Sequence, residues 1–214
     1  MLNIMTYNES KTKKKKRHEI LMHAMDLFIT DGIASVSMQQ ISKTLGISPR
    51  SLYYYYSNKE DLAVDIQILI MSTDWIFSGF ILDKNKTGYE IVCDFLHHMI
   101  DYINSHKKNI KYIAAFDYYF YNSYPGTRYQ THLEMIFRSK IFTDIIDQAG
   151  KDHTILTNGK DIRTVLSTVY HSAMAYAQRI IYREKAMNLE ASGNKGDLEL
   201  FVEYLLKGLK NNTN

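Results

Sequence analysis

Apolar residues recur at intervals of three and four along almost the whole chain, and no segment sustains an alternation of apolar and polar positions. This spacing is typical of helices that bury one face against a core. A first helix is predicted over residues 12–30. Later helices are predicted near residues 88–105, 108–122, 127–149, 159–187 and 196–210. The pattern therefore favours an all-α fold.

Two short helices are predicted directly after the first one. Ser37 can cap a helix that runs to about Leu45, and Ser48 can cap another whose first position is Pro49. Gly46 can adopt the positive φ that a tight turn between them needs. Two helices joined in this way, following a first helix, are typical of a helix-turn-helix, whose second helix lies in the major groove of DNA.

A fourth helix is predicted to begin at a capping box formed by Ser57 and Glu60 and to run to about Phe80. No proline-rich or glycine-rich linker separates this helix from the first three. We therefore expect it to join two parts of the chain rigidly. The predicted parts are a three-helix, helix-turn-helix domain with a basic N-terminal arm over residues 1–57, and a second helical domain over residues 58–214.

The positive charge of the chain is concentrated near its start. Residues 1–60 contain nine Lys or Arg against five Asp or Glu, whereas the remaining residues contain seventeen against eighteen. The excess comes from Lys11, Lys13, Lys14, Lys15, Lys16 and Arg17. Such a cluster suits a polyanion, because each neutralised phosphate releases condensed counterions. A solvated N-terminal tail is the alternative interpretation.

The second helix of the predicted pair has a polar side that could contact DNA. Arg50 carries a planar fork that fits the edge of guanine, and Tyr53, with Tyr54 beside it, could contact a base, a phosphate or a thymine methyl group. Further polar residues stand near helix starts, where backbone N–H groups favour phosphate. These residues are Ser37, Gln39, Ser48 and Lys59. Tyr56 is expected to pack in the core, whereas a core position and a phosphate contact are both open for Tyr55.

Several linked motifs occur at fixed spacing within residues 12–66. They are Ile20–Phe28 followed by Gly32, Val36–Lys43, Leu45–Ser48, Leu52–Tyr56 and Asn58–Leu62. Together they resemble the N-terminal signature of the TetR family of transcriptional regulators. The resemblance implies operator contacts from Ser37, Gln39, Pro49, Arg50, Ser51, Tyr53, Tyr55 and Lys59. The sequence departs from the family pattern at Tyr55, where His is frequent, and at Tyr56, where Phe is usual.

For the C-terminal part, the resemblance implies a helical domain that binds a ligand and forms a dimer. Apolar stripes on the last two predicted helices fit a four-helix interface between two copies. The stripe residues are Ile162, Val165, Leu166, Val169, Ala173, Ala177, Phe201, Val202, Leu205 and Leu209. A homodimer would read the two half-sites of a palindromic operator. The alternative is that both stripes complete the core of a single copy.

Residues 112–129 contain eight aromatic residues, which one helical face cannot bury together. Some of them should therefore line a cavity or an interface. Aromatic walls with polar tips suit an amphipathic or aromatic small molecule. The candidate lining residues are Trp75, Phe77, Tyr102, Phe116, Phe120, Phe137, His171 and Met174. An ordinary core position is the alternative for each of them.

Composition and motifs argue against several other classes of protein. No apolar run approaches the eighteen residues of a spanning helix, and the single cysteine, Cys93, cannot form an internal disulfide. The phosphate-binding, dinucleotide-binding and serine-hydrolase glycine motifs are missing, so we do not expect an enzyme. His97 and His98 supply too few ligands for a metal site. We expect a cytoplasmic protein without cofactor, metal or membrane contact.

These observations predict a ligand-responsive repressor that binds a double-stranded operator as a homodimer and is released by an unidentified small-molecule effector. Two alternatives stay open. One is a transcriptional activator with the same fold. The other is a protein that binds polyanions through its lysine cluster without sequence preference, in which case high salt would abolish binding to every duplex equally.

Overall fold

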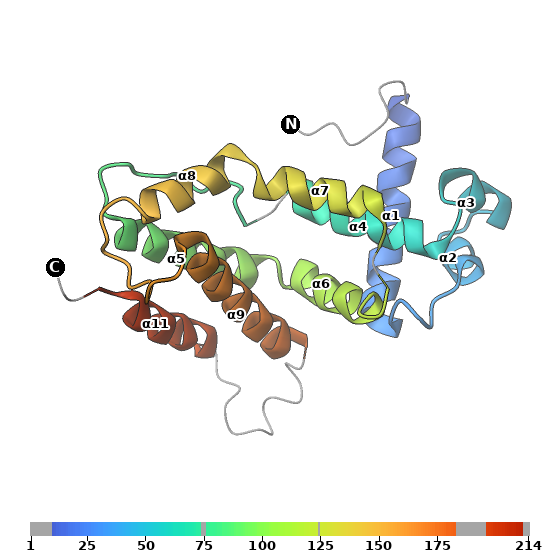
Figure 1. The fold of residues 1–214 in the computed structure, drawn as a ribbon. Coiled ribbons are helices and arrows are strands. Elements are labelled where there is room, and N and C mark those ends of the chain that lie inside the picture. Colours follow the sequence, from blue (N-terminus) through green and yellow to red (C-terminus); the bar gives the residue numbers. More distant parts are fainter. Residues whose placement is uncertain (1–9, 74–75, 124, 183–195, 212–214) are drawn as a thin grey trace. The chain divides into compact units, whose positions relative to one another are not determined.

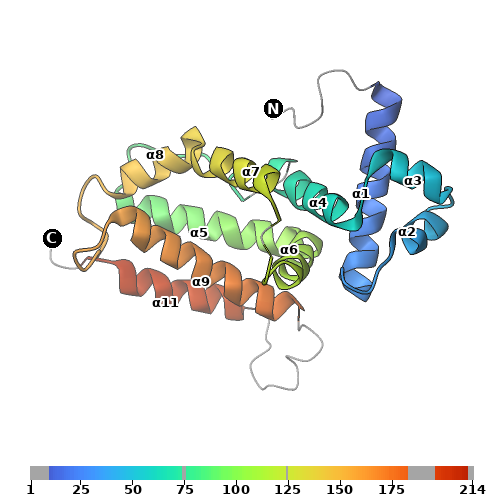
Figure 2. The ribbon, with the colours of Figure 1, turned by 45° about the vertical axis from the view of Figure 1, so that its right-hand side comes forward.

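A computed structural model describes residues 10–73, 76–123, 125–182 and 196–211 (Figures 1 and 2). Within these residues the regular elements are helices, apart from one isolated bridge between Ile155 and Lys210. The helices are α1 (Lys11–Asp31), α2 (Met38–Thr44), α3 (Pro49–Tyr55), α4 (Lys59–Thr73), α5 (Gly88–Ser105), α6 (Lys107–Tyr119), α7 (Thr127–Phe137), α8 (Lys140–Ala149), α9 (Ile162–Tyr182) and α11 (Asp197–Leu209). The predicted all-α fold is confirmed. Among the described helices, none is both long and apolar enough to cross a membrane.

The two helices of the predicted helix-turn-helix begin at the predicted caps. The Ser37 hydroxyl accepts a hydrogen bond from the Gln40 N–H at 3.1 Å, and the Ser48 hydroxyl accepts one from the Ser51 N–H at the same distance. Gly46 has a φ of 69° in the turn between α2 and α3, a conformation that costs glycine little. The local sequence therefore sets both helix starts.

The predicted limits of α4 are wrong at both ends. Asn58, rather than Ser57, caps the helix, because its side-chain oxygen accepts the Asp61 N–H at 2.7 Å. At the other end α4 stops at Thr73. Phe77 belongs to a later turn, in which Gly79 has a φ of 76°. The apolar pattern continues through this turn, so the pattern alone does not locate the end of the helix.

The single helix predicted over residues 127–149 is also wrong, because the chain forms two helices there. The backbone at Ser139 is extended, with φ −62° and ψ 148°, and it separates α7 from α8. No proline or glycine marks this break. The other C-terminal helices lie where the pattern predicts them, to within a few residues. The final residues of the helix predicted over residues 159–187 lie outside the described residues.

The chain forms two compact units, and each has its own core. Unit 1 combines Met1–Trp75 with Lys111–His132. In unit 1, α1 packs against α2 and α4, and α2 packs against α3. The helices α1, α2 and α3 bury Phe28, Ile41 and Leu52 completely. This core fixes the orientation of the short α3.

Unit 2 combines Ile76–Ile110 with Leu133–Asn214. In this unit α5 packs against both α8 and α11, and α9 packs against α8 and α11 (Figure 2). Gly88 begins α5 so close to α8 that an added Cβ would lie 2.5 Å from the Ala149 carbonyl oxygen. The predicted functional boundary at residues 57 and 58 differs from the limit of unit 1, since α4 packs on α1. That functional division stays a prediction.

Candidate functional site

The helices α2 and α3 present a polar surface in unit 1, which we call the α3 surface. Its exposed residues are Ser37, Gln39, Ser48, Pro49, Arg50, Ser51, Tyr53 and Tyr54. Leu52 faces the core from the other side of α3, as the spacing predicts. Tyr53 and Tyr54 are 54% and 68% exposed, which is unusual for large rings. The surface thus combines an arginine with two exposed rings on one short helix.

The lysine cluster is helical and lies beside the α3 surface. Ser10 caps α1 by accepting the Lys13 N–H, so the lysines occupy the first turns of a helix rather than a loose tail. The Lys13 ammonium lies 5.0 Å from the centre of the Tyr54 ring, within range for a cation–π contact. The Tyr55 ring meets Tyr54 edge to face at 5.1 Å. These contacts bring the basic start of α1 next to the exposed rings of α3.

Two residues predicted to contact DNA are engaged inside unit 1. Arg17 donates to the Asp65 carboxylate at 3.0 Å and therefore ties α1 to α4. Lys59 donates to the Ala34 carbonyl at 3.0 Å and lies 5.5 Å from the centre of the Tyr119 ring. Both cations would have to leave these partners to reach a phosphate, and their predicted DNA contacts stay predictions.

Tyr56 packs in the core as predicted, whereas Tyr55 is half-buried. The Tyr56 ring is 2% exposed, and the Arg17 guanidinium lies 4.8 Å from its centre. Burial and the nearby Asp65 carboxylate raise the pKa of Tyr56. The hydroxyl therefore stays neutral. The predicted phosphate contact of Tyr55 stays a prediction.

A group of contacts holds α4 against α6 within unit 1, and sequence reasoning missed them. The buried Tyr112 hydroxyl donates to the Ala63 carbonyl at 2.7 Å. The Tyr119 hydroxyl donates to the Glu60 carboxylate at 2.6 Å. This bond holds the pKa of Glu60 below its ordinary value, while burial and the bond together raise the pKa of Tyr119 to about 12. Part of the aromatic cluster thus serves to fix α4.

The start of α7 is held to α4 in a similar way. Arg128 forms an ion pair with Asp65, the same carboxylate that binds Arg17. His132 is buried, and its ring nitrogen lies 3.3 Å from the Ser72 hydroxyl near the end of α4. Burial lowers the pKa of His132. The helix that follows the helix-turn-helix is therefore contacted at several points along its length.

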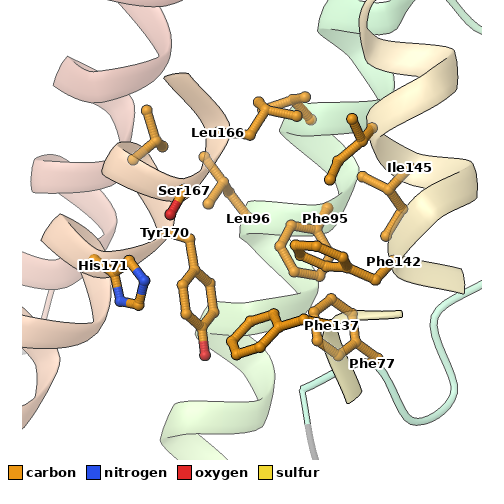
Figure 3. A pocket seen from close by; sticks show the side chains of 13 residues that line it. Phe77, Phe95, Leu96, Phe137, Phe142, Ile145, Leu166, Ser167, Tyr170 and His171 are labelled. Carbon is orange, nitrogen blue, oxygen red and sulfur yellow. The ribbon is translucent and has the colours of Figure 1, made fainter. Parts of the chain in front are cut away.

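Unit 2 contains a partly open apolar cavity of about 40 Å³ (Figure 3). Its lining comes mainly from α5, α8 and α9: Phe77, Val92, Phe95, Leu96, Phe137, Phe142, Ile145, Ile146, Leu166, Ser167, Val169, Tyr170 and His171. Three of the predicted lining residues, Phe77, Phe137 and His171, are among them. Phe95 and Phe142 belong to the apolar stripes of α5 and α8, whose pattern predicts burial but not a cavity.

Four other predicted lining residues lie outside this cavity, and their contact with a ligand stays a prediction. They are Tyr102, Phe116, Phe120 and Met174. Phe116 packs in unit 1 against Phe120 and Tyr129, with ring centres 4.7 and 5.3 Å apart. Tyr102 stacks on His106 at 4.4 Å. Helical spacing assigns these residues to a buried face without deciding which neighbour covers it. Trp75 lies outside the described residues.

Phenylalanine rings fill one side of the cavity, and carbon atoms make up nearly all of its surface. Phe77 stacks on Phe95 at 5.4 Å and meets Phe142 nearly at right angles at 5.5 Å. The polar atoms come from Ser167, Tyr170 and His171, all on α9 (Figure 3). A larger hollow of about 450 Å³ lies in the loop after α8, with His153, Asn158 and Lys160 in its polar lining. It includes none of the predicted lining residues.

Half of the predicted dimer stripe is covered within one copy. Val169, Ala173, Ala177, Val202 and Leu209 are buried in the single chain, which favours the alternative that they complete the core of one copy. The reason is that α9 and α11 pack on each other and on the rest of unit 2. Ile162, Val165, Leu166, Phe201 and Leu205 are half-buried. The outward sides of the two helices carry His171, Ala175, Arg179, Leu200 and Tyr204.

The described residues contain no group of three or more His, Cys, Asp and Glu placed to hold a metal ion. Near the two adjacent histidines of α5, Asp94 pairs with Lys86 at 2.6 Å. A ring nitrogen of His98 lies 3.0 Å from the Ser78 carbonyl.

Comparisons with known proteins agree with this arrangement. The family model of bacterial regulatory proteins, tetR family, matches residues 20–66. An HTH-type transcriptional regulator of Staphylococcus aureus (strain MRSA252) is 29% identical over 107 residues, which are 49% of this chain and 57% of that relative. The match thus spans little more than half the length of this curated relative.

Solved structures with the same fold cover nearly the whole chain. A putative TetR-family transcriptional regulator from Vibrio parahaemolyticus has a TM-score of 0.61 at 18% identity, covering 92% of this chain and 99% of that one. NalD, the secondary repressor of the MexAB-OprM multidrug efflux pump in Pseudomonas aeruginosa, has a TM-score of 0.58 at 16% identity. That comparison covers 95% of this chain and 100% of NalD.

Proposed function

We propose that this chain is a TetR-family repressor that binds an operator as a homodimer and is released by a small molecule. The observation that carries the proposal is the α3 surface. There Arg50, Tyr53 and Tyr54 are exposed on a helix whose other side is anchored by the buried Leu52. A rigid helix with exposed polar and aromatic tips suits reading of the major groove.

In this proposal, different residues make the base contacts and the phosphate contacts. Arg50 and Tyr53 would meet base edges. The helical lysines Lys13–Lys16 would meet the backbone, together with the N–H groups at the starts of α2 and α3. Ser37, Gln39, Ser48, Pro49, Ser51 and Tyr54 surround these starts. Arg17 and Lys59 would stabilise the arrangement of the helices in unit 1, because Arg17 binds Asp65 and Lys59 binds the Ala34 carbonyl.

Two copies would associate through the outward sides of α9 and α11. Leu200 and Tyr204 are 48% and 63% exposed on α11, and exposed apolar groups on neighbouring helices are typical of an interface. His171 lies on the outward side of α9 and also lines the cavity. A ligand in the cavity would therefore contact the helix that forms the interface.

The cavity in unit 2 is the proposed effector site. Release would be a shift of population between a DNA-binding and a released conformation. A shift from 1:99 to 99:1 requires the effector to favour the released state by about 5.5 kcal/mol, shared over two sites in a dimer. The helices α6 and α7 contribute residues to both units, and their Tyr119 and Arg128 contact α4. By displacing α6 and α7, the effector would move the helix-turn-helix.

The test is a comparison of specific and general DNA binding. The full-length protein would first select a palindrome from a random duplex pool, and fluorescence anisotropy would then give its affinity for that duplex and for a scrambled one. Arg50→Ala is expected to reduce the preference by about 5- to 150-fold, the value of one good base contact. Arg138→Ala, another exposed arginine, is the matched control and should change nothing.

Replacing Lys14 and Lys15 by Ala should instead weaken both duplexes about equally and flatten the salt dependence. The proposal fails if the parent protein shows no preference among duplexes. It also fails if Arg50→Ala retains the full preference of the parent, because the α3 surface would then not read the sequence.

A further inference from the structure

One carboxylate on α4 binds cations from two other helices of unit 1. The Oδ2 atom of Asp65 accepts a hydrogen bond from Arg17 of α1 at 3.0 Å, and its Oδ1 atom pairs with Arg128 of α7. We propose that Asp65 and Arg17 position α3 for reading DNA, and that Arg128 makes this positioning depend on the place of α7. The inference rests on the proposed function and names residues that regulate it.

Arg17 connects Asp65 to the C-terminal end of α3. Its guanidinium donates to the Tyr55 carbonyl at 3.4 Å and lies 4.8 Å from the centre of the Tyr56 ring. Tyr55 is the last residue of α3, and the Tyr56 N–H closes the helix by bonding the Leu52 carbonyl. Carbonyl groups in the last turn of a helix lack partners within it, and a cation there also favours the negative end of the helix dipole. Arg17 therefore stabilises the end of α3.

Tertiary contacts such as this one decide how firmly α3 is held. The helix has only seven residues, and helices of this length are not stable by themselves in water. Leu52 anchors its buried side, but the contact of Arg17 is made at its end. If that end loosens, the exposed Arg50 and Tyr53 lose their fixed direction, although the core of unit 1 stays intact.

Asp65 keeps the Arg17 guanidinium in place. The two side chains are 13% and 23% exposed, so water screens their attraction only in part. A carboxylate that binds a cation through each oxygen cannot rotate without losing one of them. If Arg128 leaves, the carboxylate is held on one side only and can turn. Arg17 then loses the fixed acceptor that directs it to the Tyr55 carbonyl.

Arg128 is the partner that can leave. Its side chain is 51% exposed, and its described contacts are all on α4: the Asp65 carboxylate, the Asp61 carboxylate at 4.0 Å and the Asp61 carbonyl at 3.3 Å. Exposed ion pairs contribute little free energy, so a small displacement of α7 is enough to break them. The residues of α7 up to His132 belong to unit 1 and the rest to unit 2. A movement of α7 therefore reaches α3 through Asp65 and Arg17.

Amide hydrogen exchange, followed by NMR on the full-length protein, tests the positioning without DNA. In Arg128→Gln the Tyr56 N–H should exchange about 2- to 30-fold faster, the range for changes along a coupling network. The Gln40 N–H at the start of α2 is bonded by Ser37 and should be unchanged, which separates a local effect from a general loss of stability. Arg138→Gln, which removes another exposed arginine, is the matched control and should change neither.

A double-mutant cycle tests whether Arg128 acts through Arg17. Arg17→Gln should also speed exchange of the Tyr56 N–H, and adding Arg128→Gln to it should have no further effect, because residues in one network are not additive. If Arg17→Gln fails to fold, Arg17→Lys takes its place in the cycle. Lysine keeps a charge for Asp65 but lacks the fork that reaches the Tyr55 carbonyl as well.

The same variants are then compared in DNA binding by fluorescence anisotropy, with the selected palindrome and the scrambled duplex. Arg128→Gln should reduce the preference for the palindrome by about 2- to 30-fold and leave the affinity for the scrambled duplex unchanged. A plain loss of positive charge would instead weaken both duplexes equally. Arg128→Lys should fall between the parent and Arg128→Gln, because it keeps the charge without the bidentate geometry.

Three results would overturn the inference: exchange of the Tyr56 N–H that is unchanged in Arg128→Gln, exchange of Tyr56 and Gln40 that rises equally, or an effect of Arg128→Gln that persists in the Arg17 variant. Faster exchange with an unchanged preference among duplexes also overturns it, because the end of α3 would then not matter for reading. If the parent protein itself shows no preference, the proposed function fails, and the exchange rates alone decide whether Arg128 and Arg17 position α3.

Discussion

The contact between the start of α5 and the end of α8 gives the sharpest test of the packing in unit 2. A Cβ added to Gly88 would lie 2.5 Å from the carbonyl oxygen of Ala149 and 2.9 Å from its carbonyl carbon. Both atoms belong to the backbone, so one helix must shift. Overpacking of this kind costs about 1–3 kcal/mol. Gly88→Ala should therefore lower the free energy of unfolding by about that amount.

The same substitution at Gly208 is the matched control. Gly208 lies in α11 with nothing within 4 Å of an added Cβ, so alanine should raise the free energy of unfolding by about 0.5–1 kcal/mol through its better helix propensity. Gly88→Ala also keeps the N–H that donates to Asp152 at 2.9 Å, so the Cβ is the only change.

Urea unfolding followed by circular dichroism at fixed protein concentration measures both variants. The midpoints should move in opposite directions, and the melting temperatures should move by about 2–4 °C per kcal/mol for a chain of this length. A Gly88→Ala protein as stable as the parent would refute the close approach of the two helices. Equal shifts of the same sign in both variants would refute the argument that the space around each glycine decides the result.

Three further changes test unit 1. Tyr112→Phe removes the buried hydrogen bond to α4 and should cost about 0.5–1.5 kcal/mol in urea unfolding, whereas Tyr121→Phe, whose ring is 74% exposed, should cost nothing. Because the folded-state pKa of Glu60 is lowered, its contribution to stability is present above the ordinary value of 4.5 and is lost as the pH falls through the folded pKa. Tyr119→Phe should therefore make stability below pH 4.5 less dependent on pH, and an unchanged pH profile would contradict this. Leu52→Ala empties a fully buried position under α3 and should cost about 2–5 kcal/mol and weaken binding to every duplex, unlike Arg50→Ala.

Local sequence was sufficient for the fold of the first helices. Ser37 and Ser48 can bond N–H groups three residues ahead, and Gly46 tolerates a positive φ, so each feature is decided within a few residues. The ends of α4 and the break at Ser139 were missed for the opposite reason. Asn58 and Ser57 are both competent caps, and Ser139 has no glycine or proline beside it. The choice among these local options depends on the contacts of the neighbouring helices.

In the candidate sites too, local sequence determined some features and contacts between distant residues determined others. The sequence by itself determined which side of α3 is exposed, because a seven-residue helix anchored by Leu52 has only one polar side. It could not decide that Arg17 and Lys59 bind partners in unit 1, since Asp65 and Ala34 are distant in sequence.

The tertiary structure alone decided what covers each apolar face in the C-terminal part. The spacing of Phe116, Phe137 and Ala173 places each on an apolar helix face, and the three lie in the unit 1 core, in a cavity wall and on the packed side of α9. Periodicity measures the angle of a residue around its own helix axis. Which neighbouring helix lies at that angle depends on how segments distant in sequence pack together. The local sequence does not determine this packing.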